Sequence, residues 1–277
     1  MRWAIRLTSL LLALSLSPVA ARGQGIVNPA ISGNVVTAQI QLPGGISADL
    51  SLTFEQPAGL DLNTLGLSAE LANPDQLLTQ GRLPSGGLVS LPSAFPVLLR
   101  VSPTGTSVLA FHGVYSISLH TENLPYSPST PLRLFKAPDG GPFKDITETT
   151  APGSYRVRGA GGTFSEFLIL SDLRNLDTVI NQKFDDLQAI LDWNEKAIES
   201  TVLSNLRTRL TQARTAYATG DITTAMQKLR DFNDLVVARS GSDIPDVWRA
   251  NSSLVNVAGL LRSAGSTLSY SLSLKVG

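Results

Sequence analysis

The sequence predicts an α+β protein in which an N-terminal antiparallel β-sandwich is followed by a C-terminal antiparallel helical bundle. Residues 26–170 contain short runs of alternating apolar and polar side chains that are separated by turn residues. From Asp172 onward, the apolar spacing changes from two residues to about 3.6, which is the repeat of an α-helix. Because no helical segment separates the strands, the pattern favours an antiparallel sandwich over a parallel sheet.

Strands are expected wherever the alternation is clear. These segments are residues 34–41, 46–54, 95–101, 114–120, 132–136, 154–158 and 164–170. Residues 60–71 fit neither period, and residues 73–96 are rich in Pro, Gly and Ser, which predicts a long surface loop. Gly153-Ser154-Tyr155 is compatible with the corner tyrosine of an immunoglobulin-like sandwich, and equally with a tyrosine that simply begins a strand.

Two glycine-containing segments predict turns. Pro138-Asp139-Gly140-Gly141-Pro142 combines a fixed φ, a side chain that bonds its own backbone and residues that accept positive φ. Gly159-Ala160-Gly161-Gly162 superficially suggests a phosphate-binding loop. It lacks the Lys-Ser/Thr pair of such a loop and precedes a strand, so a hairpin turn is expected instead.

Four helices are predicted from stripes of apolar residues that recur at steps of three and four. The first stripe runs from Leu173 to Leu191, and capping-box spacing at Asp192 and Glu195 predicts that a second helix begins at Trp193. Gly220 and Asp221 end that helix and cap the next, so these two helices must be antiparallel neighbours. Asp243 and Pro245 are expected to open a fourth helix, because proline is tolerated in a first turn. The remaining stripes comprise Leu203, Leu206, Leu210, Ala213 and Tyr217; Ile222, Ala225, Leu229, Phe232 and Val236; and Val247, Ala250, Leu254, Ala258 and Leu261.

These helical residues resemble the small all-helical FIMAH-type modules at the C-termini of secreted bacterial proteins. The matching positions are Leu206, Leu210, Ala213, Gly220, Asp221, Ala225, Leu229, Phe232, Val236, Ala238 and Gly241. Ser242 departs from the pattern, since a basic residue often follows that last glycine. The β part, around residues 131–147 and 153–172, resembles an uncharacterised family of secreted bacterial proteins. The first resemblance implies a helical fold, and the second implies no activity.

The C-terminal residues 266–277 alternate apolar and polar side chains with a period of two. A helix would scatter such a pattern around its surface, so the sequence predicts a final strand that returns to the sheet. The alternative is a frayed, disordered tail. The predicted organisation is therefore a signal peptide at residues 1–21, a sandwich at 26–170, a bundle at 171–265 and a strand or tail at 266–277.

The N-terminus predicts export. Arg2 and Arg6 precede a short apolar run and then small residues, which is the organisation of a secretory signal peptide. Cleavage is expected after Ala21, with Gly23 as the second choice; an uncleaved anchor helix is disfavoured because Pro18 interrupts the run. The chain has 277 residues, no Cys, 43% hydrophobic residues and a formal net charge of +0. This composition excludes disulfides and thiolate metal sites, and it gives no electrostatic signature of nucleic-acid binding.

No catalytic, cofactor-binding or metal-binding residues are assigned from the sequence. The two histidines, His112 and His120, would lie roughly 26 Å apart on one strand, so they cannot share a metal ion. No nucleophile elbow is present. The carboxylates that could serve a glycosidase are all expected on turns or polar strand faces. They are Glu122, Asp139, Asp145, Glu148 and Glu166.

Two tryptophans of the mature chain, Trp193 and Trp248, are expected to pack where the helices meet the β part rather than to form a sugar-binding platform. The glycosylation sequon at Asn251-Ser252-Ser253 is expected within a helix, where it has little meaning.

The sequence therefore predicts a secreted or periplasmic, non-enzymatic interaction or structural protein of the bacterial envelope or exterior, with no cofactor. Its partner would be an unknown protein or extracellular ligand, with no nucleic acid and no membrane span after signal cleavage. Two alternatives are an extracellular binding module for a glycan or peptide that uses the loops of the sandwich, and a hydrolase whose site is not recognisable.

Overall fold

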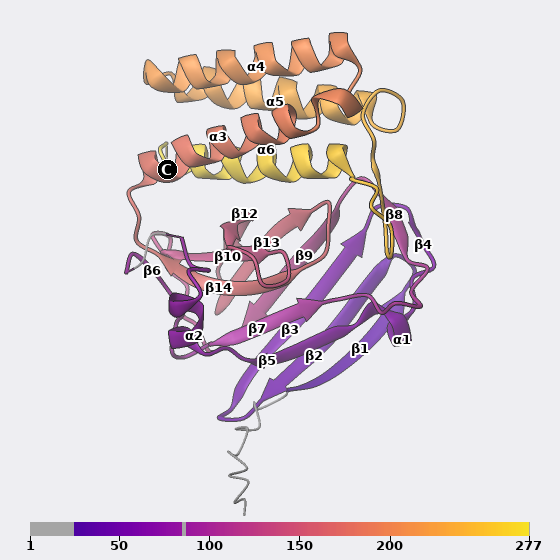
Figure 1. The fold of residues 1–277 in the computed structure, drawn as a ribbon. Helices are drawn as coiled ribbons and strands as arrows, with labels where there is room; N and C mark the ends of the chain where they lie inside the picture. The colour runs from indigo at the N-terminus through magenta and orange to yellow at the C-terminus, as the bar shows by residue number, and fades with distance from the viewer. Residues whose placement is uncertain (1–24, 85–86, 277) are drawn as a thin grey trace, which may run out of the picture.

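The protein is an α+β structure in which antiparallel sheets precede the long helices, as predicted (Figure 1). The computed structural model describes residues 25–84 and 87–276. The predicted signal peptide, residues 1–21, lies outside the described residues. Two larger sheets and a small third sheet occupy the lower part of Figure 1, and the long helices are stacked above one end of them, with only some of the helices next to the sheets.

The first sheet joins distant parts of the chain through antiparallel pairs. Its strands, in spatial order, are β1 (Ile26–Ser32), β2 (Val35–Leu42), β3 (Ile46–Phe54), β9 (Tyr115–Thr121), β13 (Tyr155–Gly161) and β12 (Thr147–Ala151). On β2, Val36, Ala38 and Ile40 are buried, whereas Thr37 and Gln39 are exposed. The predicted alternation therefore holds, and it places a polar face on the outside of this sheet.

The second sheet lies opposite the first and shares a hydrophobic core with it. It contains β11 (Lys144–Asp145), β10 (Leu132–Ala137), β14 (Glu166–Asp172), β7 (Val97–Val101) and β5 (Leu67–Leu71), and β6 (Val89–Ser90) pairs with β14. Leu52 and Ile117 of the first sheet belong to the same cluster as Leu134 and Ile169 of the second. The other face of the second sheet carries Phe135 and packs in a separate cluster.

Two loop predictions in the β part need correction. Residues 73–96 contain the short helix α2 (Pro74–Thr79) and strand β6, and the ambiguous residues 60–71 form the helical turn α1 (Leu62–Leu65) followed by β5. Gly159, Ala160 and Gly161 belong to β13, so they form no hairpin; the chain after them crosses from the first sheet to the second. A Cβ on Gly159 would lie 2.6 Å from the carbonyl oxygen of Ile146, so glycine is required by close packing.

The turn at residues 138–142 is confirmed. It joins β10 to the antiparallel strand β11, and Gly140 adopts a φ of 70°. Since β11 carries Asp145 toward the helices, this turn helps to position a side chain that is central to the candidate site.

Four long helices form the second part, and the stripes predicted at residues 203–217 and 222–236 are buried or half-buried as predicted. They are α3 (Leu176–Trp193), α4 (Ser200–Ala218), α5 (Ile222–Arg239) and α6 (Val257–Ser273), with a 3-10 turn η1 (Glu195–Ala197) after α3. The turn at Gly220 and Asp221 is confirmed: Gly220 has a φ of 82°, and Asp221 accepts a hydrogen bond from the Thr224 amide at 2.9 Å. The helices share a hydrophobic cluster of their own, separate from the core of the sheets.

The predicted start of the second helix at Trp193 is wrong. Helix α3 continues through Trp193, and α4 begins at Ser200, where the Glu199 carboxylate accepts a hydrogen bond from the Val202 amide at 2.9 Å. At the other end of α3, Asn175 is the N-cap, so Leu173 lies before the helix and is exposed.

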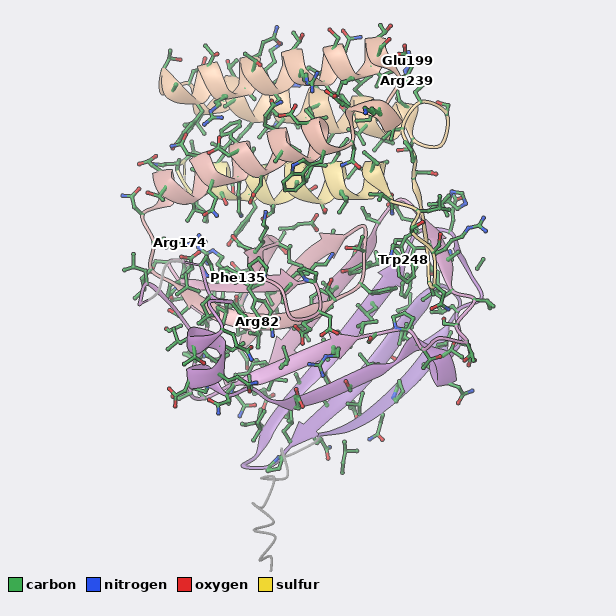
Figure 2. The ribbon with its side chains drawn as sticks, viewed as in Figure 1. Arg82, Phe135, Arg174, Glu199, Arg239 and Trp248 are labelled. Atoms are coloured by element: carbon green, nitrogen blue, oxygen red, sulfur yellow. The ribbon has the colours of Figure 1, made fainter. Side chains whose placement is uncertain are left out.

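The predicted fourth helix from Asp243 is also wrong, because residues 247–249 return to the β part. They form β15 (Val247–Arg249), which pairs with β8 (Ala110–His112), and β8 pairs with β4 (Pro57–Ala58) to complete a third, three-stranded sheet. Trp248, which is labelled in Figure 2, lies beside this sheet. Its ring stacks on that of Phe111, with 5.4 Å between ring centroids. This aromatic contact binds the segment to the sheet before α6 begins.

The final strand predicted for residues 266–277 is absent from the described residues, because residues 257–273 form α6. The alternation concealed a helical stripe: Leu261, Leu268 and Leu272 face the helical core, and Thr267 and Ser271 are buried beside them. A Cβ on Gly265 would lie 2.3 Å from the side-chain oxygen of Asn233, so this glycine permits a close approach of α5 and does not end the helix.

Within the described part of the chain, no helix combines the length and hydropathy that a membrane crossing requires.

Candidate functional site

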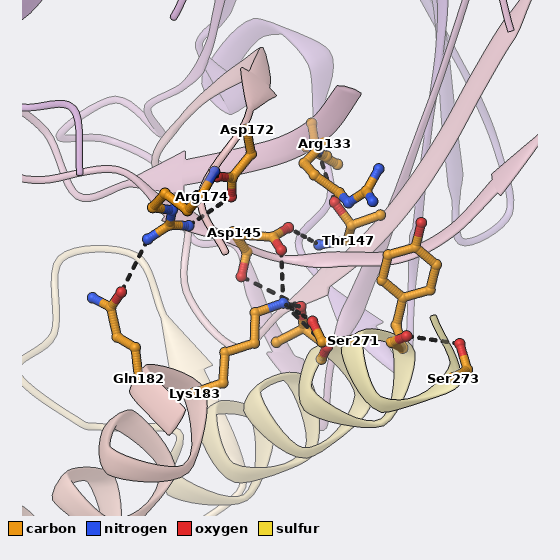
Figure 3. A network of polar contacts seen from close by, with 12 residues as sticks. Arg133, Asp145, Thr147, Asp172, Arg174, Gln182, Lys183, Ser271 and Ser273 are labelled. Carbon is orange, nitrogen blue, oxygen red and sulfur yellow. Dashed lines mark hydrogen bonds and ion pairs between the residues drawn. The ribbon is translucent and has the colours of Figure 1, made fainter. Parts of the chain in front are cut away.

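A buried cluster of polar side chains lies where the helices meet the sheets (Figure 3). Lys183 reaches it from α3, Asp145 from β11, and Thr267 and Ser271 from α6. The Lys183 Nζ atom donates to Asp145 Oδ2 at 2.7 Å, Thr267 Oγ1 at 2.7 Å and Ser271 Oγ at 2.8 Å. We call these four residues the polar junction.

Local sequence explains how the polar junction is positioned. Lys183 lies on the buried stripe of α3, between Ile180 and Leu187, so its side chain must point into the molecule. Thr267 and Ser271 are four residues apart on α6 and therefore share one helical face. All four side chains of the junction are at least 90% buried, and such a cluster is stable only when its polar atoms are paired.

The charges in the junction compensate one another. Burial raises the pKa of Asp145, but the Lys183 ammonium and the hydrogen bonds of Thr147 outweigh this effect, so the pKa lies below its usual value. Asp145 also accepts a hydrogen bond from the Thr147 amide at 2.8 Å. The carboxylate is thus held ionised with its acceptor positions occupied, and it is poorly suited to take a proton from a substrate.

A hollow of about 430 Å³ opens beside the polar junction. Arg174 lines it and is paired with Asp172, with Nε–Oδ1 at 2.8 Å and Nη2–Oδ2 at 2.7 Å. Arg133 also lines it, and its Nη1 atom donates to the backbone oxygens of Thr130 at 2.6 Å and Leu132 at 2.7 Å. Among the described residues, no carboxylate forms an ion pair with Arg133.

Further contacts attach the helices to the sheets. Arg262 of α6 forms a bidentate ion pair with Glu55, with N–O distances of 2.7 and 2.8 Å. Lys144 forms an ion pair with Asp186 of α3 at 2.6 Å. The Asn256 side chain, which caps α6, donates to the backbone oxygen of Gly113 at 2.6 Å.

A glycine contact brings α6 close to the β part. A Cβ on Gly162, between β13 and β14, would lie 2.7 Å from the backbone of Gly259 on α6. The helices and sheets are therefore joined by many polar contacts and by direct backbone packing.

The two histidines lie on different strands, each beside its own carboxylate. His112 Nδ1 lies 3.3 Å from Asp246, and His120 Nδ1 lies 3.3 Å from Asp49. In residues 25–84 and 87–276, no three His, Cys, Asp or Glu side chains gather in a way that could hold a metal ion.

The five candidate carboxylates are not brought together, and their predicted placement on solvated positions is wrong for two of them. Glu122 and Asp139 are exposed. Asp145 belongs to the polar junction, and Glu166 is buried between Arg82 and Arg100, with Arg100 Nη2 at 2.6 Å. The pairing of β14 with β7 sets Glu166 opposite Arg100, and this partner lies 66 residues away in sequence.

Glu148 is half-buried beside Arg158, 3.8 Å from its Nε atom. Burial raises the pKa of its carboxyl above the usual value, although Arg158 and Ser266 act in the opposite direction.

The expectations for the tryptophans and the sequon are corrected in part. Trp248 packs in the β part, but Trp193 is 79% exposed at the end of α3. Asn251 lies in the segment before α6, with a φ of 58°, and donates to the Gly105 backbone oxygen at 2.9 Å. It is therefore not inside a helix.

Sequence reasoning missed the residues that matter most here: Lys183, Arg133, Thr267 and Ser271. Lys183 could have been found, because a lysine inside an apolar helical stripe is expected to be buried and then needs a hydrogen-bonding or charged partner. Thr267 and Ser271 could not be recognised, because α6 was expected to be a strand. Arg133 lies on the predicted strand 132–136, where no local pattern marked it as lining a hollow.

The fold and the candidate site define a class: an α+β protein whose antiparallel sheets and C-terminal helices meet at a buried, charge-compensated polar junction. The chain belongs to the family of unknown function DUF6689, whose model matches residues 10–275. None of the curated proteins with which the chain was compared is similar to it.

Proposed function

We propose that the chain is a secreted or periplasmic, non-enzymatic interaction or structural protein of the bacterial envelope or exterior. In this proposal, the sheets act as an antiparallel sandwich and the helices as an antiparallel bundle, and the two parts form one rigid body that presents its surfaces to an extracellular partner. The N-terminal charge and hydropathy pattern and the resemblance of residues 206–241 to FIMAH-type modules support an exported role.

The polar junction is the observation that carries this proposal. Lys183 and Asp145 are the kind of groups that an enzyme could use, but they are buried and hydrogen-bonded to each other and to α6. A catalytic base needs a free acceptor within reach of its substrate. Side chains with these contacts instead serve to hold the helices on the sheets.

A binding module for an extracellular glycan or peptide is the second candidate. It is favoured by a hollow of about 240 Å³ on the outer face of the first sheet, lined by Gln39, Gln41, Asp49, His120 and Glu122 among others. Amide and carboxylate side chains suit sugar hydroxyls and peptide groups. A glycan array probed with the mature protein and with Gln39→Ala tests this candidate; a signal that the variant loses would favour it.

The leading proposal is tested in the bacterium that encodes the chain. Because the sequence has no Cys, single cysteines can be introduced at Thr37 on the sheet and at Thr211 on α4, both exposed, and labelled with a photocrosslinker. We expect the protein in the periplasmic or culture fraction, with residues 1–21 removed in its intact mass, and a discrete crosslinked adduct from one of the two positions.

Recovery of the full-length chain from the cytoplasm, or no adduct from either position, would contradict the proposal. Hydrolysis of chromogenic ester, glycoside or peptide substrates that is abolished by replacing one carboxylate, such as Glu148→Gln, would replace it with the third candidate, a hydrolase.

A further inference from the structure

The hollow beside the polar junction has the composition of a small-molecule site. Its volume of about 430 Å³ falls within the usual range for ligand pockets. Pro128, Leu176, Val179 and Leu274 give it apolar walls, and Arg133 is a charged group in its lining. Pockets that bind small ligands combine a mostly apolar lining with a few fixed polar groups in this way.

Arg133 is held in place by the protein but has no acidic partner among the described residues. The backbone oxygens of Thr130 and Leu132 both accept from its Nη1 atom, and the guanidinium carbon lies 5.5 Å from the centre of the Tyr270 ring. Arg133 is half-buried, and no described carboxylate pairs with it. A guanidinium fixed in this manner loses little side-chain entropy when it binds an anion.

The charge around the hollow is positive by one unit. The lining itself contains Arg133 and Arg174 with Asp145 and Asp172, and the Lys183 ammonium, which is bonded to Asp145 outside the lining, brings the total to +1. Burial lowers the pKa of Lys183, and although Asp145 raises it, Arg133 and Arg174 lower it further. The neighbouring lysine therefore experiences the positive potential of both arginines.

A single carboxylate with a short apolar body matches these properties. One negative charge balances the excess, and an arginine offers two parallel N–H donors to a carboxylate. A phosphate dianion would exceed the available positive charge and would gain nothing from the apolar walls.

We propose that this hollow binds a small organic monocarboxylate, with its charged end on Arg133 and its apolar body against Leu176 and Val179. The bound molecule would lie between β10, α3 and α6, so it would also strengthen the contact between helices and sheets. This site goes beyond the interaction role proposed above, and its ligand-binding group, Arg133, is not part of the polar junction.

Titration calorimetry of the mature full chain with sodium hexanoate, and separately with sodium phosphate, tests the proposal. We expect saturable binding of hexanoate that Arg133→Met weakens at least tenfold. Arg214→Met is the matched control, because Arg214 pairs with Asp185 on the exposed surface of the helices at 2.7 Å, and it should leave the affinity unchanged.

Ser129→Trp provides a second variant in case Arg133→Met impairs folding. Ser129 is exposed at the hollow, so a tryptophan should obstruct it and abolish hexanoate binding without changing the urea unfolding midpoint.

No hexanoate binding, equal affinity in Arg133→Met and wild type, or tighter binding of phosphate would each overturn the carboxylate site. These outcomes concern the hollow alone, whereas the crosslinking experiment reports on export and partners, so failure of one proposal is distinguishable from failure of the other.

Discussion

Lys183 and Asp145 show how strongly one buried charge depends on another. Replacing Lys183 with methionine would leave the Asp145 carboxylate buried without its cation. Removing one partner of a buried ion pair costs about 3–5 kcal/mol. We expect Lys183→Met to lower the free energy of unfolding in urea by this amount.

Two further variants make the Lys183→Met measurement specific. Lys228→Met on α5 removes a lysine whose ion pair with Asp231 is at the surface, at 3.8 Å, and it should change stability by less than about 1 kcal/mol. The double variant Lys183→Met with Asp145→Leu removes both charges, and it should recover much of the loss. A single variant as stable as wild type would show that the pair contributes nothing.

Lys136 on β10 is a half-buried cation, and it has no carboxylate partner in the described structure. Its Nζ atom donates to Thr163 Oγ1 at 2.9 Å and lies 5.8 Å from the centre of the Tyr115 ring. Burial lowers the pKa of Lys136 to about 7. In the unfolded chain a lysine titrates near 10.4, so between about pH 7 and pH 10 the unfolded state binds more protons.

The contribution of Lys136 to stability should therefore rise with pH across that interval. Stability of wild type relative to Lys136→Met is measured by urea unfolding at pH 7, 8.5 and 10, so that effects common to both proteins cancel. We expect the difference to shift in favour of wild type as pH increases. A difference that does not vary with pH would show that the ammonium is already well solvated in the fold.

At the residue scale, the sequence predicts which side chains are buried, but it does not predict which side chains they pair with. The stripe of α3 implied that Lys183 faces inward, yet nothing near it in sequence identified Asp145, 38 residues earlier. The same holds for the ion pairs of Glu166 with Arg82 and Arg100. Their partners are distant in sequence, and the Arg100 pair depends on strand register.

Helix α6 packs so closely against the β part that one of its positions tolerates only a glycine. Gly259 lies in its first turn, and a Cβ there would be 2.4 Å from the Gly113 backbone oxygen. Helix propensity alone favours alanine over glycine by about 1 kcal/mol. Because the contact is with backbone, which cannot move aside, we expect Gly259→Ala to destabilise the protein by about 1–3 kcal/mol instead.

Ser263→Ala serves as the control for this substitution. Ser263 is on the same helix, and its hydroxyl donates to the Leu260 backbone oxygen at 3.1 Å. Thermal unfolding followed by circular dichroism compares the two variants. If Gly259→Ala instead increases stability, α6 does not pack closely against the backbone at Gly113.

At the element scale, the spacing of apolar residues was enough to predict those helices and strands that bury one apolar face. Strand β3 matches its predicted bounds, 46–54, and the stripes of α4 and α5 are buried as expected. It failed for α6 because this helix buries hydroxyls as well as leucines, so its inner face does not appear apolar. It also failed for β15, whose three residues are held by an aromatic contact with a distant strand.

On the scale of the molecule, two hydrophobic cores are joined by polar contacts and by α6. Truncation after Gly265 would remove Leu268 and Leu272 from the helical core, and Thr267 and Ser271 from the polar junction. We expect the sheets and the helices to unfold together at lower urea than in the intact chain. Truncation after Lys275, which leaves α6 complete, is the matched control.

The two parts can be followed separately in a Trp193→Phe background. Trp248 fluorescence then reports on the sheets, and circular dichroism at 222 nm reports mainly on the helices. If the shortened chain unfolds like the control, or if its sheet signal is unaffected, α6 does not join the two parts.

The order of the elements along the chain determines when each part of the fold can be completed during synthesis. It leaves the sheets after β14, builds three helices, returns for β15 and only then forms α6. Phe111 receives its stacking partner 137 positions later, and Asp145 meets Thr267 only when the final helix is present. Contacts between such distant positions form slowly. A nascent chain of this design therefore stays incompletely folded until its last segments have emerged, and an incompletely folded chain is the form that the export proposed above would require.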